Sequence, residues 1–480
     1  MVEKINMTMV TDFYEITMAN GYFDCDMKDN IGYFDLFFRK MPDDGGFAIM
    51  AGVEQLIEYL KSLTFTEDDV QYLRNKGTFD ERFLEYLRNF KFSCDVWSVR
   101  EGTPIFPGEP IITVRGPIIE AQFIETMSLL LINHQSLVAT KANRVVRAAK
   151  GRPIMEFGTR RAHGVSAAVY GARAAYIGGC AGTACAMADR EFGIPALGTM
   201  AHSWVQMFDS EYEAFKAYAK IYPDNCIFLI DTYNVLKSGL PAAIKVFKEL
   251  KPSKMGIRID SGDITYLTKQ ARKILDEAGL KDCSIVVSNS LDEYVIRELL
   301  SQGAQIDSFG VGERLITSKS EPVFGGVYKL VAVEIDGKII PKIKISENVE
   351  KITNPHVKDL YRLYDNTTGK ALADVIAIAG EERPKAEEVT GYEIFDQDAI
   401  WKRKKLENFT AVNLRVKIFE KGKCLYKSPS IKEIKEFCEK EIGTLWEETL
   451  RFEKPQTYYV DLSPKLWELK NDLIKNSVVE

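Results

Sequence analysis

The chain has 480 residues, of which 46% are hydrophobic and 28% are charged. This composition is typical of a globular protein of roughly two to four domains, and it excludes collagen, coiled coils and wholesale disorder. The net charge is -6, with 63 Lys and Arg against 69 Asp and Glu. Because this balance gives no broad basic field, we expect no nucleic-acid partner and, at most, small phosphorylated ligands.

The first part of the chain mixes short apolar runs with amphipathic segments. Apolar runs predict strands at residues 31–39, 96–99 and 111–114, and amphipathic segments predict helices at 53–63 and 66–90. Prolines mark turns between the later strands. This part of the chain is therefore predicted to be an α+β layer of its own.

From residue 153 onward, short apolar runs alternate with polar loops and helical segments. Strands are predicted at 153–157, 196–198, 226–230, 255–259, 284–287 and 308–311, with helices at 271–279 and 293–300 among them. Unusual polar or glycine-rich segments follow nearly every strand. That distribution is typical of the active face of a barrel, whereas an open sheet concentrates its site at one crossover. We therefore predict an α/β fold with an irregular (β/α) barrel.

The last part of the chain returns to strands and then to helices. Strands predicted at 327–335, 337–345, 358–364 and 374–379 are expected to extend the first layer, and amphipathic helices are predicted at 431–446 and 464–475. The predicted organisation is an N-terminal arm at 1–24, a discontinuous α+β sandwich domain at 25–130 plus 327–400, a barrel at 131–326, and a mostly helical extension at 401–480.

The cysteines and the apolar runs restrict the compartment. Eight cysteines are scattered without a paired Cys-x-x-Cys spacing, so a metal knuckle is not expected. No apolar run approaches the ~20 residues of a membrane span, and residues 1–9 lack the apolar core of a secretory signal. We predict a cytoplasmic protein with reduced thiols and no membrane contact.

Two glycine segments could bind phosphate. Gly310 and Gly312 follow the last predicted barrel strand, and Gly325 and Gly326 come soon after. Glycines let backbone amides approach an anion, and barrels often hold phosphate at their last loops. Either segment alone is more simply a turn, but their position together favours a phosphorylated substrate.

Arg258, Asp260 and His202 could carry chemistry. Arg258 and Asp260 alternate along a predicted strand, so their side chains share a face. They form either a structural ion pair or a site in which Arg258 binds a carboxylate while Asp260 holds sugar hydroxyls or Mg2+. His202 precedes a predicted helix at 203–215, where a neutral or phosphorylated imidazole is favoured. The alternative is a capping loop in which Ser203 caps the helix.

Six motifs occur together in one order: Thr-Asp-Phe-Tyr-Glu at Thr11, Phe-Gly-Thr-Arg-Arg at Phe157, Gly-Thr-Met-Ala-His-Ser at Gly198, Ile-Asp-Thr-Tyr-Asn at Ile230, Arg-Ile-Asp-Ser-Gly-Asp at Arg258, and the glycine segments. In this combination the chain resembles nicotinate phosphoribosyltransferase, of the type II phosphoribosyltransferase fold. The resemblance runs from Thr11 to about Leu330 and extends toward the C-terminus.

The resemblance implies an activity and a set of roles. The enzyme would join nicotinate to 5-phosphoribosyl 1-diphosphate (PRPP), coupled to ATP hydrolysis through a phosphohistidine at His202, with Mg2+ as cofactor. His202, Asp260 and Arg258 would be catalytic. The residues implied at the nicotinate site are Tyr14, Phe157, Thr199 and Arg258, with Tyr14 coming from the N-terminal arm of the neighbouring subunit of a homodimer. The residues implied at the PRPP site are Arg160, Asp231, Asp260, Asn289, Gly310, Gly312, Glu313, Gly325 and Gly326.

Two aspects of the resemblance leave alternatives. Glu313 stands where some relatives carry a threonine facing the phosphate, so the backbone amides are the contacts expected there. A related enzyme for nicotinamide or quinolinate would place different charge demands on the pocket, and Arg258 alone does not separate the three substrates. A barrel that only senses phosphosugars or NAD precursors is the other alternative, although a sensor has no use for a phosphorylatable His202.

Overall fold

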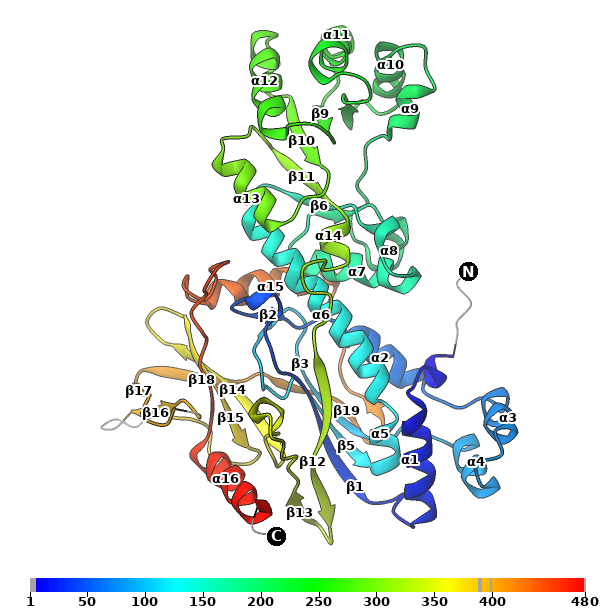
Figure 1. The fold of residues 1–480 in the computed structure, drawn as a ribbon, viewed down its shortest axis with the longest axis vertical. Helices are drawn as coiled ribbons and strands as arrows, with labels where there is room; N and C mark the ends of the chain where they lie inside the picture. Colours follow the sequence, from blue (N-terminus) through cyan, green and yellow to red (C-terminus); the bar gives the residue numbers. More distant parts are fainter. Residues whose placement is uncertain (1–5, 387–390, 398, 479–480) are drawn as a thin grey trace. The chain divides into compact units, whose positions relative to one another are not determined.

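The computed structural model describes residues 6–386, 391–397 and 399–478, and the chain divides into two compact units (Figure 1). Unit 1 comprises Met1–Leu137, Val323–Pro429 and Glu436–Glu480, and unit 2 comprises Val138–Pro322 with Ser430–Lys435. Each unit has its own sheet. The helix α6 (Glu125–Ala148) and the helix α15 (Ile431–Thr444) both contain a boundary between the units.

The main sheet of unit 1 has seven antiparallel strands in the order β13-β12-β1-β5-β3-β19-β20. Their bounds are β1 Ile31–Phe38, β3 Asp95–Val99, β5 Ile112–Pro117, β12 Gly326–Ile335, β13 Lys338–Pro341, β19 Arg415–Glu420 and β20 Lys423–Cys424. The predicted strands at 31–39, 327–335 and 337–345 therefore do meet, although nearly 300 residues separate them. Strand β1 is buried over Gly32–Phe38, which explains its almost continuous apolar sequence.

A second sheet of unit 1 has four strands in the order β18-β14-β15-β21. Their bounds are β14 Lys358–Asp365, β15 Ala371–Ile378, β18 Phe409–Asn413 and β21 Val460–Leu462; the smaller pairs are β2 Ala48–Ile49 with β4 Pro104–Ile105, and β16 Tyr392–Phe395 with β17 Arg403–Leu406. The buried Lys358 Nζ lies 2.8 Å from Asp35 on β1, so an ion pair links the two larger sheets.

The structure differs from two expectations here. Strands 358–364 and 374–379 do not extend the first sheet, because β14 and β15 pair with β18 and β21 instead. The region 401–480 was expected to be mostly helical, yet it supplies the strands β17 to β21 besides α15 and α16 (Pro464–Val478). Alternating apolar residues specify which face of a strand is buried but not which strand it pairs with. The local sequence therefore predicts neither the pairing of β14 and β15 nor the pairing of the strands within residues 401–480.

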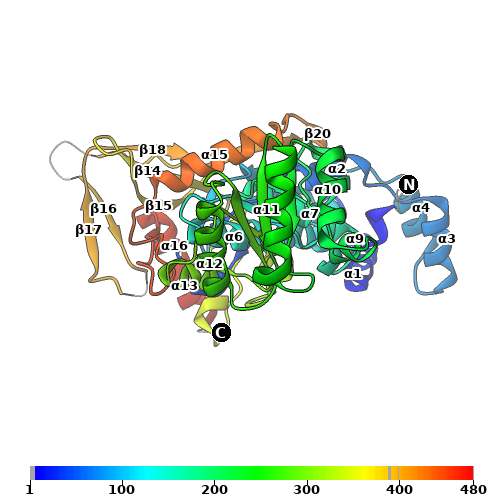
Figure 2. The ribbon, with the colours of Figure 1, turned by 90° about the horizontal axis from the view of Figure 1, so that it is seen from above.

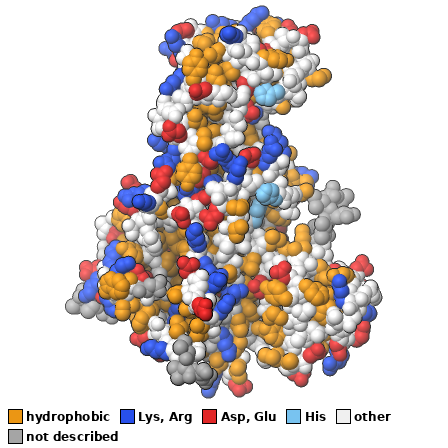
Figure 3. All heavy atoms as spheres, in the orientation of Figure 1, with side chains coloured by type: hydrophobic (Ala, Val, Ile, Leu, Met, Phe, Trp, Pro, Cys, Tyr) orange, Lys and Arg blue, Asp and Glu red, His pale blue; other side chains and the backbone are white. Residues whose placement is uncertain are grey.

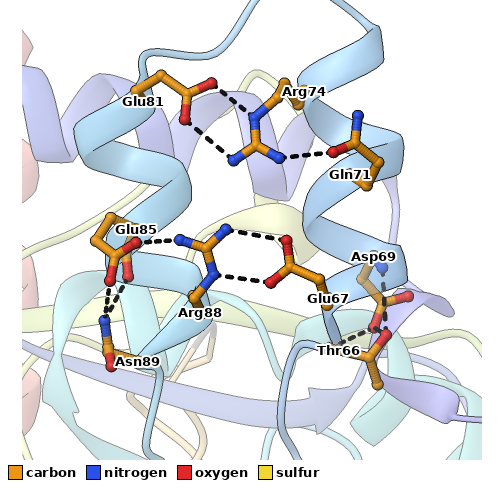
Figure 4. Close-up of polar contacts among 9 residues, drawn as sticks. All are labelled: Thr66, Glu67, Asp69, Gln71, Arg74, Glu81, Glu85, Arg88 and Asn89. Carbon is orange, nitrogen blue, oxygen red and sulfur yellow. Dashed lines mark hydrogen bonds and ion pairs between the residues drawn. The ribbon is translucent and has the colours of Figure 1, made fainter.

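The helices of unit 1 also refine the sequence prediction. Their bounds are α1 Phe13–Asp24, α2 Val53–Ser62, α3 Glu67–Asn75, α4 Glu81–Arg88 and α5 Ile118–Gln122. The single helix predicted at 66–90 is two helices, because Gly77 adopts a left-handed φ of 68° and Asp80 caps α4. Figure 4 shows how charges join the pair: Arg88 on α4 contacts Glu67 on α3, and Arg74 on α3 contacts Glu81 on α4.

The sheet of unit 2 has six parallel strands in the order β7-β6-β11-β10-β9-β8. Their bounds are β6 Ile154–Glu156, β7 Gly182–Thr183, β8 Cys226–Leu229, β9 Met255–Ile259, β10 Ser284–Ser288 and β11 Ser308–Val311. Strands β7 and β8 are its two edges, so the predicted irregular barrel is an open half barrel. Five of the six predicted strands are present. The run 196–198 makes only an isolated bridge between Thr183 and Ala196, and the sequence analysis missed β7.

Helices follow most strands of unit 2. Their bounds are α7 Val165–Ile177, α8 Ala186–Phe192, α9 His202–Gln206, α10 Glu211–Ile221, α11 Leu240–Leu250, α12 Ile264–Glu277, α13 Glu293–Ser301 and α14 Glu313–Ile316. Helices α10, α11 and α12 pack against β8, β9 and β10 respectively, and Figure 2 shows these three helices seen from above. Because the strands are parallel, their carboxyl ends all lie along the same side of the sheet, which is the edge that carries the candidate site described below.

The structure also bears on possible membrane spans, disulfide bonds and surface charge. Within the described residues, no helix is both long and apolar enough to cross a membrane. All eight cysteines are free thiols. On the face shown in Figure 3, acidic and basic side chains both occur over each unit, without a surface of one sign.

Candidate active site

Arg258 connects two strand ends and one loop segment of unit 2. It lies on β9, and its guanidinium donates from Nε to Ser288 Oγ (2.9 Å), from Nη1 to Thr199 Oγ1 (3.2 Å) and from Nη2 to Asp260 Oδ1 (3.0 Å). The Arg258 side chain is 15% exposed. Arg258, Asp260, Ser288 and Thr199 are called the Arg258 cluster below. The expected shared face of Arg258 and Asp260 is therefore present, and the two form an ion pair.

Asp260 and Asp231 are linked through the turn after β9. Asp260 Oδ1 also accepts a hydrogen bond from Ser288, while its side chain is 33% exposed. Asp231 follows β8, and its Oδ2 accepts from the Asp260 backbone N–H (3.1 Å) and from Ser261 Oγ (2.6 Å). Asp231 therefore fixes the backbone of the turn that presents Asp260.

His202 faces the second oxygen of Asp231. The imidazole Nε2 lies 3.9 Å from Asp231 Oδ1, and Nδ1 lies 3.2 Å from Thr232 Oγ1. The Asp231 side chain is only 1% exposed, yet Oδ1 has no hydrogen-bond partner in the structure. A buried acceptor without a partner is costly, so this oxygen is available to orient an imidazole N–H after a small movement.

The helix expected after His202 is shorter than predicted. Helix α9 covers only His202–Gln206, with Ala201 rather than Ser203 at the N-cap, and α10 begins separately at Glu211. A helix of five residues has a small dipole, so the expected dipole contribution at His202 is weak. Asp231 and Thr232 are the contacts that position this imidazole.

Phe157 packs directly over two glycines of the β11 end. Its ring centroid lies 5.6 Å from Arg258 Cζ, and its backbone N–H donates to Val311 O (2.8 Å). A Cβ added at Gly310 would lie 2.6 Å from Phe157 Cδ2, and one at Gly312 would lie 3.1 Å from the Phe157 carbonyl oxygen. Glycine at position 310 is therefore required by the close approach of an aromatic ring, whatever its amide binds.

Three other predicted residues lie at neighbouring strand ends. Arg160 is exposed in the short turn Thr159–Arg161 after β6. Asn289 is exposed directly after β10, with a φ of 96°. Glu313 begins α14 and pairs with Lys319 (3.1 Å), which holds the pKa of the Glu313 carboxyl below its usual value. All three lie on the edge of the sheet that carries the Arg258 cluster.

Tyr14, Gly325 and Gly326 belong to unit 1. Tyr14 lies on α1 with 45% of its surface exposed, and burial of its hydroxyl, together with Glu125, raises its pKa. Gly325 has a left-handed φ of 72°, and the Gly326 N–H donates to Asn133 Oδ1 (3.2 Å). Their predicted contact with ligands of unit 2 stays a prediction.

Two hydroxyl side chains of the site were not predicted from the sequence. Ser288 bridges Arg258 and Asp260, and Thr232 contacts His202. Both stand in segments that follow predicted strands, next to residues that were selected. Position at a strand end was the available signal, but a hydroxyl alone does not suggest a partner.

Two cavities of unit 1 contain none of the predicted site residues in their linings. One of about 270 Å3 is lined by residues that include Asp35, Arg39, Lys358 and Lys470, and it contains none of the predicted site residues. Within the described residues, no group of three or more His, Cys, Asp or Glu side chains is arranged to hold a metal ion. The Arg258 cluster is selected by its chemistry rather than by depth.

Sequence comparisons decide the family. Models of the nicotinate phosphoribosyltransferase N-terminal domain, family and C-terminal domain match residues 9–133, 153–377 and 357–470. The chain is 44% identical over 467 residues to nicotinate phosphoribosyltransferase of Bacillus subtilis, covering 97% of this chain and 94% of that protein. The chain belongs to the nicotinate phosphoribosyltransferase family. The human nicotinate phosphoribosyltransferase is 31% identical over 532 residues, covering 97% and 96% of the two chains.

Solved structures agree with this family. The crystal structure of human nicotinic acid phosphoribosyltransferase matches with a TM-score of 0.83 and 29% identity, covering 97% of this chain and 99% of that one. A nicotinate-nucleotide pyrophosphorylase from Pyrococcus furiosus shares the fold, with a TM-score of 0.71, 22% identity and coverage of 92% and 97%. The predicted fold of the nicotinate phosphoribosyltransferase family is thus confirmed.

Gly310→Ala should displace Phe157 and destabilise the protein by about 1–3 kcal/mol, because the new methyl group overpacks against the ring. The shift in the urea unfolding midpoint would measure this cost. Gly198→Ala is the matched control, since a Cβ there meets no atom within 4 Å. Equal stability of the two variants would contradict the packing role of Gly310.

Proposed function

We propose that this protein joins nicotinate to PRPP and releases nicotinate mononucleotide and diphosphate, as a step in NAD biosynthesis from nicotinate. The observation that carries the proposal is the Arg258 cluster, a nearly buried guanidinium at a strand end beside a carboxylate and an aromatic ring. Family membership over nearly the whole chain supports the same reaction. We also propose a cytoplasmic location.

Arg258 would recognise the carboxylate of nicotinate. A guanidinium forms strong charge-assisted hydrogen bonds to carboxylates, and its Nη1 group is already oriented by donating to Thr199 Oγ1. Phe157 would stack on one face of the pyridine ring, since its own ring lies beside Arg258. Nicotinate, unlike the neutral nicotinamide, would offer Arg258 a second carboxylate besides that of Asp260.

Carboxylates and backbone amides would bind PRPP. Loss of diphosphate gives the ribose oxocarbenium character, which a nearby carboxylate such as Asp260 stabilises while it orients the hydroxyl groups. The phosphates would be bound by the side chains of Arg160 and Asn289 and by the backbone amides of Gly310, Gly312 and Glu313. Asp231 would fix the turn that presents Asp260, and the amides of Gly325 and Gly326 are the further contacts that the family resemblance implies. The pyridine nitrogen already has its lone pair, so no strong base is needed.

Mg2+ fits the oxygen donors of this edge. Asp260 is partly exposed, and the buried Oδ1 of Asp231 lacks a partner. Mg2+ usually takes one or two carboxylates and completes its shell with water and substrate phosphates, rather than a full protein cage. Asp260 and Asp231 would hold the ion, which would neutralise charge on the leaving diphosphate.

A turnover assay with PRPP and nicotinate, nicotinamide or quinolinate, each with and without MgATP, tests the function. A nucleotide product should form with nicotinate and PRPP, and no product should form with nicotinamide or quinolinate. Turnover with quinolinate or nicotinamide instead would assign the other branch of the fold. Binding of PRPP without product from any pyridine would support the sensor alternative.

Arg258→Ala should raise the KM for nicotinate by about tenfold or more and that for PRPP much less, because a charge-assisted hydrogen bond is worth about 1.5–3 kcal/mol. Steady-state kinetics with each substrate varied in turn would measure both values. Equal increases for the two substrates would show that Arg258 only holds the neighbouring segments of unit 2 together.

We further propose that ATP phosphorylates His202 and that hydrolysis of the phosphohistidine drives nucleotide formation. The supporting geometry is the imidazole between Asp231 and Thr232, 40% exposed and therefore accessible. A neutral imidazole nitrogen would attack the γ-phosphorus of ATP, the bond to the bridging oxygen would break, and ADP would leave. Water would later release phosphate from the histidine.

His202→Asn should abolish nicotinate-dependent ATP hydrolysis while slow nucleotide formation continues at high PRPP, because diphosphate displacement needs no base. Phosphate release and product formation would be followed in parallel, with intact-mass analysis after MgATP treatment. His163→Asn is the control, because His163 is exposed in the same unit and has no proposed role. Retained coupling in His202→Asn would contradict the assignment.

We also propose a homodimer in which Tyr14 completes the neighbouring subunit's site. The exposed ring of Tyr14 lies near other exposed apolar residues of the N-terminal segment, among them Phe13 and Met18, and such a surface suits a subunit contact. The reach of this segment to a second copy would supply an aromatic ring for the face of the pyridine opposite Phe157.

Mixing inactive Tyr14→Ala chains with inactive Asp260→Ala chains should restore activity, because each mixed dimer would contain one intact site. Activity of heterodimers purified through two different tags would be compared with that of each homodimer. Tyr14→Phe is a control that keeps the ring and should retain activity in the homodimer. Inactive heterodimers would place Tyr14 in the site of its own subunit.

A further inference from the structure

Glu156 is a buried carboxylate to which the proposed reaction gives no role. It is the last residue of β6, it is 0% exposed, and burial raises the pKa of its carboxyl group. It directly precedes Phe157, and in the sheet it lies between Thr183 of β7 and Val311 of β11. A carboxylate at such a position needs hydrogen-bond partners, and the structure supplies them.

Both carboxylate oxygens of Glu156 accept hydrogen bonds, one from the turn after β6 and one from strand β7. Oε1 accepts from the Gly158 backbone N–H, and Oε2 accepts from Thr183 Oγ1 at 2.6 Å. Thr183 Oγ1 itself accepts from the Cys185 N–H at 3.0 Å, so its one hydrogen is free to point at Glu156. The pattern therefore fits a carboxylate with two acceptor oxygens.

Thr183 extends these contacts to the segment before Thr199. The Leu197 N–H donates to Thr183 O at 2.8 Å, and the Thr183 N–H donates to Pro195 O at 3.0 Å. Leu197 is two residues from Thr199, which contacts Arg258. Glu156 is thus connected on one side to the turn after Phe157 and on the other to the segment that carries Thr199.

We propose that Glu156 is a positioning residue for the pyridine site, holding the Phe157 turn and the Thr199 segment at fixed separation through Thr183. The inference rests on the proposed function, because it assigns the pyridine to Phe157 and Thr199. A side chain that touches neither substrate acts here through placement, and a displacement of about 1 Å can cost about 100-fold in rate. Neither Glu156 nor Thr183 was selected from the sequence.

Glu156→Gln and Thr183→Val should each raise the KM for nicotinate by about tenfold while the KM for PRPP changes by less than about twofold. In the Glu156→Gln variant an NH2 donor replaces one acceptor oxygen, so the charge-assisted hydrogen bond from the Thr183 hydroxyl is lost and only a weaker, reversed hydrogen bond to Thr183 Oγ1 can replace it. Thr183→Ser keeps the hydroxyl and should behave like the wild type. The double variant should be no worse than the poorer single variant, because both remove the same contact.

Glu211→Gln is the matched control, since Glu211 is a 6% exposed carboxylate of unit 2 whose pKa is also raised by burial. Its KM for nicotinate should stay unchanged. Equal increases in both KM values, an additive double variant, a Thr183→Ser variant as poor as Thr183→Val, or the same defect in Glu211→Gln would each overturn the proposal. If Glu156→Gln fails to fold, the two Thr183 variants decide. Absence of turnover in the wild type would instead refute the proposed function.

Discussion

The hydrogen bonds of one arginine organise the functional edge of this protein. Arg258 reaches Thr199, Asp260 and Ser288 at once; Asp260 and Ser288 lie at the ends of β9 and β10, and Thr199 lies in the segment after the isolated bridge at Ala196. A guanidinium that is nearly buried requires such partners, because an unpaired charge is costly away from water. The same contacts fix its orientation before any ligand arrives, which lowers the ordering cost of binding.

The chemistry at this edge rests on carboxylates, glycines and arginines more than on histidine. Asp231 contributes to two parts of the site. Its Oδ2 accepts a hydrogen bond from the Asp260 N–H and so holds the turn that presents Asp260, and its Oδ1 faces His202. A single buried carboxylate therefore connects the proposed sugar site to the proposed phosphohistidine. The proposed coupling between ATP hydrolysis and nucleotide formation would act through this residue, because both proposed sites depend on its position.

The sequence by itself determined the repeating units and the chemistry of the strand ends. Five of six barrel strands follow from short apolar runs, and the shared face of Arg258 and Asp260 follows from the alternation of side chains along β9. These are local properties, so local sequence specifies them. The order of six motifs was enough to indicate the family that the comparisons then showed.

Only the tertiary structure decided which distant segments meet. Strand β19 joins β3 in the first sheet, while β14 and β15 leave it, and Thr183 becomes the partner of Glu156 through a two-residue strand that has no clear pattern. Nor does sequence show that Gly310 is needed to admit the ring of Phe157. Strand pairing and close packing depend on chain segments that are far apart in sequence. The residues next to a position along the chain therefore do not predict which distant segment it will contact.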